Sequence, residues 1–320
     1  MIKKMNNNIL IVAGGTGGHI VPAVVFGKNL QAHSKNVKWL CGSRSLEKNI
    51  YNALNVDPFQ VSIDGSPLGS KSILKDLKRC FSLVKSFFQT SKFIKNFKPD
   101  EIYLFGGYMS FAPLLIAKFK KSPVTLHEQN AIAGKVTKIA AKLGAKILTG
   151  WPVCKGIEKF EFFGIPVREP ERIKRSEALK ILNLNINENS KIIGVAGGSL
   201  VSEELSRLLI ETSKLCGEFE FVFLSHEEKN EANRHFILPQ WNVNPFFSIC
   251  DVIVCRAGGS TLAEALKWEI PTVTIPWPEA ADNHQEDNAR EFVKLAKNSH
   301  MFSEKDTPEH LAALFANIVK

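Results

Sequence analysis

The chain has 320 residues, of which 44% are hydrophobic and 23% are charged, and it carries a formal net charge of +9. This composition excludes a disordered or low-complexity protein, and no apolar run approaches the roughly 20 residues that a membrane-spanning helix needs. The length favours two domains. The six cysteines form no C-x-x-C pair, so the sequence predicts neither a zinc site nor a disulfide framework.

Residues 9–22, ILIVAGGTGGHIVP, predict a strand, a glycine loop and the start of a helix. Residues 9–13 form the buried strand, four glycines follow, and His19 stands where the helix begins. Free N–H groups and the dipole at a helix start favour an anion or a lone-pair-rich oxygen. Two common phosphate loops are excluded, because position 20 is not glycine and no Gly-Lys-Ser/Thr follows. The loop therefore predicts a binding site of another kind.

The first half of the chain alternates predicted strands and helices. Strands are expected at 37–40, 59–63, 102–105 and 124–126, and helices at 23–32, 46–54 and 109–118. Such alternation indicates a parallel sheet with helices on both faces, where ligands bind at the carboxyl ends of the strands. Three glycine-rich or polar loops follow strands in this way, at 14–19, 106–110 and 127–130.

Residues 71–98 form a basic segment, with eight lysines and arginines against a single acid, Asp76. Phenylalanine, leucine and valine recur there at helical spacing. One interpretation is an amphipathic helix that binds an anionic membrane surface. The other is a crossover helix that packs its apolar stripe on the sheet and exposes its lysines. Nucleic acid is the weaker explanation of the charge, because no binding motif accompanies it.

The second half begins a similar unit after a junction at residue 164, which gives domains at 1–163 and 164–320. A strand at 191–196, a loop at 197–199 and a helix at 202–216 resemble the opening unit. A strand at 252–254 leads to a Gly-Gly-Ser-Thr loop and a helix at 262–267, with Glu264 expected in its first turn as a dipole partner or a ribose ligand. A strand at 271–276 and a polar loop at 277–288 follow.

Seven motifs appear in the order and spacing of glycosyltransferase family 28, and the chain resembles that family over nearly its whole length. They are GGTGGH at 14–19, GGYMS at 106–110, HEQN at 127–130, G-x-PVR at 164–168, GGS at 197–199, CRAGGSTLAE at 255–264 and D-x-HQ-x-x-NA at 282–289. The resemblance implies an α/β GT-B fold, in which two Rossmann-like domains with parallel sheets face each other across a cleft.

The implied reaction is an inverting transfer of GlcNAc from UDP-GlcNAc to the 4-hydroxyl of MurNAc in lipid I, which forms lipid II for peptidoglycan synthesis. The implied location is the cytoplasmic face of the cell membrane, docked through residues 71–98, with other cell-wall enzymes as further partners. The resemblance makes His19 the general base, with Glu128 as the alternative. The residues expected to shape the acceptor side are Thr16, Gly17, Gly18, Tyr108 and Glu128.

The donor, UDP-GlcNAc, is expected mainly in the C-terminal domain. The resemblance puts Arg168 and Ser199 at the diphosphate and Glu264 at the ribose. It implies no tightly bound cofactor and no catalytic metal, and the sequence has no Asp-x-Asp pair. The full set of expected donor residues is Thr16, Gly17, Gly18, Asn130, Arg168, Gly198, Ser199, Arg256, Ser260, Thr261, Glu264, His284 and Gln285.

Two alternatives remain at this stage. One is a different UDP-sugar GT-B enzyme, such as a lipid glycosyltransferase or a UDP-GlcNAc epimerase. The other is a catalytically weakened homologue that serves as a membrane-surface scaffold, suggested by Leu200 and Val201 where the family has Gln-Gly, and by the end of the chain at Lys320.

Overall fold

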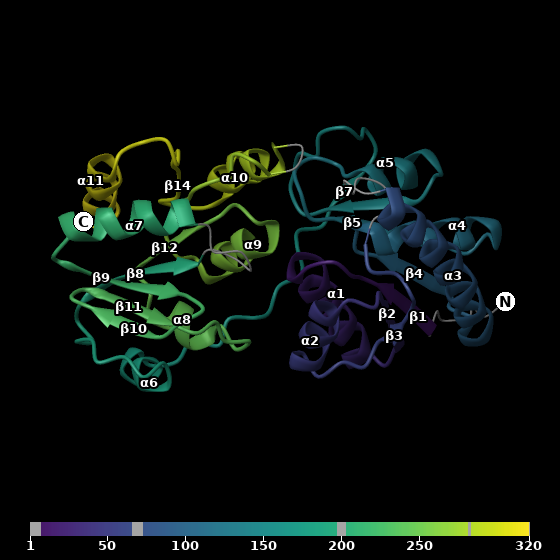
Figure 1. The fold of residues 1–320 in the computed structure, drawn as a ribbon, viewed down its shortest axis with the longest axis horizontal. Coiled ribbons are helices and arrows are strands. Elements are labelled where there is room, and N and C mark those ends of the chain that lie inside the picture. Colours follow the sequence, from purple (N-terminus) through teal and green to yellow (C-terminus); the bar gives the residue numbers. More distant parts are fainter. Residues whose placement is uncertain (1–7, 66–72, 197–202, 281–282, 320) are drawn as a thin grey trace. The chain divides into compact units, whose positions relative to one another are not determined.

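The computed structural model describes residues 8–65, 73–196, 203–280 and 283–319, with side chains omitted for 73–80 and 203. The chain divides into two compact units, Met1–Val167 and Arg168–Lys320. The sequence placed this junction slightly earlier, after residue 163. Each unit contains one sheet with helices packed against it (Figure 1).

The first unit has a parallel sheet whose strand order is that of a Rossmann fold. In spatial order the strands are β3 (Phe59–Gln60), β2 (Asn36–Cys41), β1 (Asn8–Val12), β4 (Glu101–Leu104), β5 (Val124–Glu128), β6 (Lys146–Thr149) and β7 (Glu161–Phe162). Because β1 lies between β2 and β4, the chain changes direction across the sheet there, and the loops after β1 and β4 flank this switch point.

Helices cover both faces of this sheet, which explains the uninterrupted apolar run in β1. Ile9 and Ile11 pack with α1 (Gly17–Ala32) and α2 (Ser45–Ala53). Leu10 and Val12 face the opposite core, which includes residues of α3 (Ile73–Phe97), α4 (Phe111–Phe119) and α5 (Lys135–Lys142). A short 3-10 helix, η1 (Tyr108–Ser110), precedes α4.

The second unit repeats this plan. Its sheet runs in the order β10 (Lys229–Glu231), β11 (Arg234–Ile237), β9 (Phe219–Leu224), β8 (Lys191–Ala196), β12 (Val252–Cys255), β13 (Thr272–Thr274) and β14 (His300–Met301), and only β10 is antiparallel to its neighbour. One face packs against α7 (Glu203–Leu215) and α11 (Pro308–Ile318). The remaining helices are α6 (Arg175–Ile181), α8 (Asn244–Ile249), α9 (Gly259–Trp268) and α10 (His284–Leu295).

The two sheets confirm the predicted α/β class, while several boundaries differ from the sequence expectations, most of all at β3, α9 and α10. β3 contains two residues instead of five. Helix α9 begins at Gly259, so Glu264 lies in its second turn and not in the first. The polar loop expected at 277–288 was wrong in its second part, because α10 begins at His284. Within the described residues, no helix is long and apolar enough to span a bilayer.

Candidate functional site

The glycine loop after β1 leads directly into α1, as the sequence predicted. Thr16 is the exposed N-cap residue, and Gly17 and Gly18 form the first turn of the helix. Gly15 has a φ of +96°, a conformation that side chains rarely adopt. The loop therefore places the start of α1 and the exposed Thr16 at the switch point of the first sheet.

The half-buried imidazole of His19 lies against the loop that follows β4. A methyl group placed on Gly107 would lie 3.5 Å from Nδ1 of His19, and one placed on Gly106 would lie 3.5 Å from Nε2. Both glycines have positive φ angles, +72° at Gly106 and +68° at Gly107. The Gly-Gly pair of the second motif thus forms the surface on which the imidazole rests, and it brings two of the predicted loops together.

Tyr108 joins the same site through its hydroxyl, which donates a hydrogen bond to the carboxylate of Glu47 on α2. Burial and this hydrogen bond raise the pKa of Tyr108 far above its ordinary value, so the phenol stays protonated. Glu47 is not among the site residues that the sequence indicates. Nothing in its local sequence marks it, because only its complete burial in the folded chain reveals its role.

The HEQN motif places Glu128 at the end of β5, where its carboxylate is buried. Oε1 accepts from the backbone N–H and the side-chain amide of Asn130, at 3.0 and 3.2 Å. Oε2 accepts from the N–H of Gly134 at 3.0 Å and from the hydroxyl of Thr137 at 2.5 Å. Two of these four donors belong to Asn130, and the other two lie at Gly134, the N-cap of α5, and at Thr137 inside α5, so Glu128 fixes the amide of Asn130.

His127 in the same motif makes structural contacts within the first unit. Its Nε2 donates to the carbonyl of Gly164 at 2.7 Å, Nδ1 lies 3.2 Å from the amide of Gln129, and the ring stacks on Phe105. This arrangement requires the neutral imidazole with the proton on Nε2. Burial lowers the pKa of His127 from 6.5 to about 4.

We expect this burial to make the first unit sensitive to mild acid. The unfolded chain takes up a proton near pH 6.5 and the folded chain only near pH 4, so stability falls as the pH decreases between these values, by roughly 3 kcal/mol in all. Urea unfolding at pH 7.5 and at pH 5 measures the loss. The His127→Gln variant should lose less stability over the same interval, and an equal loss in both proteins would contradict this assignment.

In the second unit the structure brings together two of the expected donor-binding residues. Arg168 contacts Oε1 of Glu264 through Nε at 3.3 Å and through Nη2 at 2.6 Å, and its Nη1 donates to the carbonyl of Trp241. Both side chains of this ion pair are partly buried. Glu264, the expected ribose ligand, is thus held by the guanidinium of Arg168, the expected diphosphate ligand.

Arg256 and Gln285 lie around the loop that follows β12. The buried guanidinium of Arg256 pairs with Glu304, with an Nη2 to Oε1 distance of 2.7 Å, and Nη1 also donates to the carbonyl of Ile275. The Gln285 carbonyl accepts from the N–H groups of Ala257 and Trp277, at 3.1 and 2.9 Å. These side chains fix the loop. The sequence does not indicate Glu304, because it lies outside every motif.

The other expected donor residues stand at helix starts or outside the described chain. Ser260 and Thr261 lie in the first turn of α9, and His284 begins α10. Gly198 and Ser199 fall in the segment 197–202, outside the described residues. Among the residues that are described, no group of three His, Cys, Asp or Glu side chains is placed to hold a metal ion.

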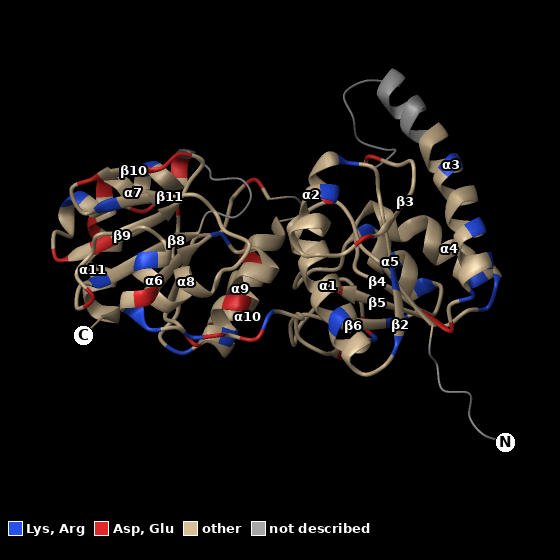
Figure 2. Ribbon diagram, turned by 90° about the horizontal axis from the view of Figure 1, so that it is seen from below, with Lys and Arg blue, Asp and Glu red and all other residues tan. Residues whose placement is uncertain are grey.

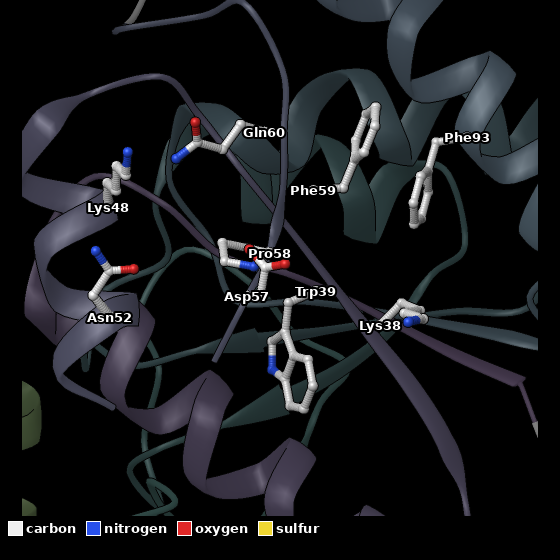
Figure 3. Close-up of a pocket in the computed structure, with 9 residues that line it drawn as sticks. All are labelled: Lys38, Trp39, Lys48, Asn52, Asp57, Pro58, Phe59, Gln60 and Phe93. Atoms are coloured by element: carbon white, nitrogen blue, oxygen red, sulfur yellow. The ribbon is translucent and has the colours of Figure 1, made fainter. Parts of the chain in front are cut away.

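A pocket of about 490 Å³ opens at the edge of the first sheet and contains none of the expected site residues. Figure 3 shows its lining, in which Phe59 of β3 stacks on Phe93 of α3 with a centroid distance of 4.6 Å. The pocket lies where β3 is too short to cover the outer edge of β2, since only Leu40 and Cys41 are paired there.

Comparison with known proteins places both units in one family. The glycosyltransferase family 28 N-terminal domain matches residues 9–149, and the C-terminal domain of the same family matches residues 192–320. A relative from Protochlamydia amoebophila is 32% identical over 95% of this chain and 85% of its own length. A relative from Coxiella burnetii is 31% identical over 95% of this chain and 87% of its own length.

Both relatives are named UDP-N-acetylglucosamine–N-acetylmuramyl-(pentapeptide) pyrophosphoryl-undecaprenol N-acetylglucosamine transferase. Among solved structures, MurG from Acinetobacter baumannii superposes with a TM-score of 0.75 at 24% identity, covering 98% of this chain and 91% of that one. UDP-GlcNAc 2-epimerase from Methanocaldococcus jannaschii gives 0.65 at 14% identity, covering 98% and 93%. The structural likeness shows the GT-B fold, and the two domain matches show that the chain belongs to glycosyltransferase family 28.

Proposed function

We propose that this chain transfers GlcNAc from UDP-GlcNAc to the 4-hydroxyl of MurNAc in lipid I and so forms lipid II for peptidoglycan synthesis. The observation that carries the proposal is the similarity, at about 30% identity over nine-tenths or more of the chain, to transferases named for this reaction. The His19 loop at the switch point of the first sheet supports it, because it places an imidazole, the proposed base, beside the start of a helix.

The first unit is proposed to bind the acceptor. Its N–H groups at the start of α1 suit the pyrophosphate or a sugar oxygen of lipid I. The 4-hydroxyl oxygen of MurNAc then attacks C1 of GlcNAc, its proton passes to His19, and the bond from C1 to the UDP oxygen breaks with its electron pair on UDP. Attack from the face opposite UDP inverts the configuration at C1.

The second unit is proposed to bind the donor. Arg168 would stabilise the negative charge that develops on UDP as it leaves, a task that a metal ion performs in other transferases. Glu264 would accept hydrogen bonds from the ribose hydroxyls. Because the guanidinium supplies the required positive charge, the proposed reaction involves no metal ion and no tightly bound cofactor.

The direct test is transfer of labelled GlcNAc from UDP-GlcNAc to a short-chain lipid I analogue. We expect a disaccharide product whose formation depends on both substrates. UDP-GlcNAc binding without transfer to the lipid I analogue would contradict the proposal and favour the scaffold or another acceptor. Conversion of UDP-GlcNAc to its C2 epimer, with UDP still attached and without any acceptor, would instead identify a UDP-GlcNAc epimerase.

We also propose that α3 docks this enzyme on an anionic lipid surface at the cytoplasmic face of the cell membrane. Where its side chains are described, the helix has two apolar faces. Phe87 and Ile94 pack into the core of the first unit. Phe81, Val84 and Phe88 recur along another face and expose 74%, 55% and 69% of their surface. The helix is therefore a crossover helix and at the same time presents an apolar stripe to the outside.

Lysines lie beside the exposed apolar stripe of α3, and their positive charge favours an anionic lipid surface as its binding partner. Lys85, Lys92 and Lys95 are exposed on the same helix, and Figure 2 shows basic positions along α3. A protein partner would require complementary acidic groups, whereas anionic headgroups with acyl chains below them fit phenylalanine beside lysine. Each lysine near such a surface contributes about 1 kcal/mol.

We expect the double variant Phe81→Ser/Phe88→Ser to bind phosphatidylglycerol vesicles at least about tenfold more weakly, because it loses two aromatic side chains from the interface. Vesicle sedimentation measures the partition. The matched control is Leu215→Ser, which removes an exposed apolar side chain from the second unit. Equal binding of both variants, or equal binding to neutral phosphatidylcholine, would contradict docking through α3.

A further inference from the structure

Three loops of the first unit converge on one buried carboxylate, that of Glu47. Its Oε1 accepts from the N–H of Gly15 at 2.8 Å and from the hydroxyl of Tyr108, and its Oε2 accepts from the N–H of Gly42 at 2.7 Å. These donors follow β1, β4 and β2 respectively, and Glu47 itself is fully buried. A single side chain thus connects the ends of three neighbouring strands.

The main chain at Gly42 and Gly14 packs closely against the Glu47 carboxylate. A methyl group on Gly42 would come within 2.9 Å of Oε2 of Glu47 and 2.7 Å of the Tyr108 hydroxyl, and one on Gly14 would lie 3.0 Å from the same Oε2. The glycines at these positions therefore allow the main chain to approach the carboxylate closely. A buried carboxylate held by several donors gives each of them one fixed position.

Two of the residues that Glu47 holds, Gly15 and Tyr108, lie close to the imidazole of His19. A methyl group on Gly15 would lie 3.7 Å from Nδ1 of His19 and 3.8 Å from Cε1 of Tyr108, so both rings border the residue that Glu47 holds. The hydroxyl of Tyr108 is turned toward Glu47, which orients the ring beside the imidazole. Any change in the Glu47 contacts therefore alters the support of His19 from two sides.

We propose that Glu47 is a positioning residue for the transfer reaction, which acts by holding the Gly15 main chain and the Tyr108 ring so that His19 is aligned with the acceptor hydroxyl. The proposal rests on the proposed function for its kinetic part. Its structural part, the attachment of three loops to one carboxylate, is measurable without any turnover.

The test compares Glu47→Gln with the wild type in steady-state transfer. Glutamine keeps the shape of the side chain but replaces one acceptor oxygen with a donor, so at least one of the three donors loses its partner. A displacement of about 1 Å at a reacting group costs about a hundredfold. We expect kcat to fall by about ten- to a hundredfold, with the KM for UDP-GlcNAc unchanged because the donor is proposed to bind the second unit.

A double variant separates positioning from simple loss of stability. Because Glu47 is proposed to act partly through Tyr108, the losses in kcat caused by Glu47→Gln and by Tyr108→Phe should be less than additive in the double variant. Fully additive losses would overturn the part of the proposal that acts through Tyr108. The matched control is Glu158→Gln, which removes the same charge from an exposed position of the first unit and should behave as the wild type.

Amide hydrogen exchange supplies the readout that is independent of catalysis. Glu47→Gln should speed exchange in residues 14–18 and 42–44, which contain the N–H groups that donate to Glu47, and leave the segments remote from Glu47 unchanged. This result with an inactive wild type would refute the proposed function but support the attachment of the loops. Unchanged exchange in both segments, or faster exchange throughout the unit, would overturn the role of Glu47.

Discussion

Replacing His19 with glutamine is expected to lower kcat for GlcNAc transfer by about 10²- to 10⁴-fold, the range that a general base contributes. Glutamine fills similar space on Gly106 and Gly107, so the loop should keep its shape, but an amide cannot take up the proton of the MurNAc hydroxyl. Steady-state transfer to the lipid I analogue measures the loss, and calorimetric binding of UDP-GlcNAc should remain as in the wild type.

The control for this variant is His33→Gln at the other end of α1, where the side chain is exposed and Nδ1 lies 2.8 Å from the carbonyl of Asn29. That protein should transfer GlcNAc at the wild-type rate. A His19→Gln enzyme that retained more than about a tenth of wild-type kcat would exclude His19 as the base. Glu128 would then be the next candidate despite its four hydrogen bonds.

The second large effect is expected for Arg168→Gln. Removal of a charge that stabilises a leaving group costs about 10²- to 10³-fold in kcat. The variant also leaves the partly buried Glu264 without its cation, so we expect the KM for UDP-GlcNAc to rise as well. Transfer kinetics at varied UDP-GlcNAc concentration separate the two effects.

Arg175→Gln provides a matched control, because Arg175 forms a similarly buried ion pair with Asp251 at 2.7 Å that belongs to no expected site. It should lower the stability of the second unit while kcat and the KM for UDP-GlcNAc stay unchanged. If Arg168→Gln changed only stability in the same way, its ion pair with Glu264 would be purely structural and the proposed diphosphate contact would be wrong.

The parts of the fold that could be predicted are those whose pattern depends on local chemistry. The run from Ile9 to Ala13 and the glycines after it predict a buried strand and a tight loop because both signals are continuous in sequence. The start of helix α10 could not be predicted in this way. Its inward face includes Asn288, which donates to the carbonyl of Ala257 at 3.0 Å, so a polar side chain stands where the helical pattern requires an apolar one.

The same limit applies to the site. His19, Tyr108 and Arg168 belong to recognisable motifs, so the sequence could indicate them. Glu47 and Glu304 lie in segments without a motif, and their roles follow from burial and from partners far away in sequence. Glu47 lies on helix α2, where an acid is normally exposed, and no local signal distinguishes this exception.

The Arg168–Glu264 ion pair gives Arg168 a counterion from within the second unit. Under the proposed roles, UDP-GlcNAc binding is an exchange of partners, in which phosphate replaces a carboxylate at Arg168 and ribose hydroxyls replace the guanidinium at Glu264. Fewer salt ions are then released than if a dianion bound an unpaired arginine. The affinity for UDP-GlcNAc should therefore depend only weakly on ionic strength, so that the donor site works alike in dilute and in salt-rich surroundings.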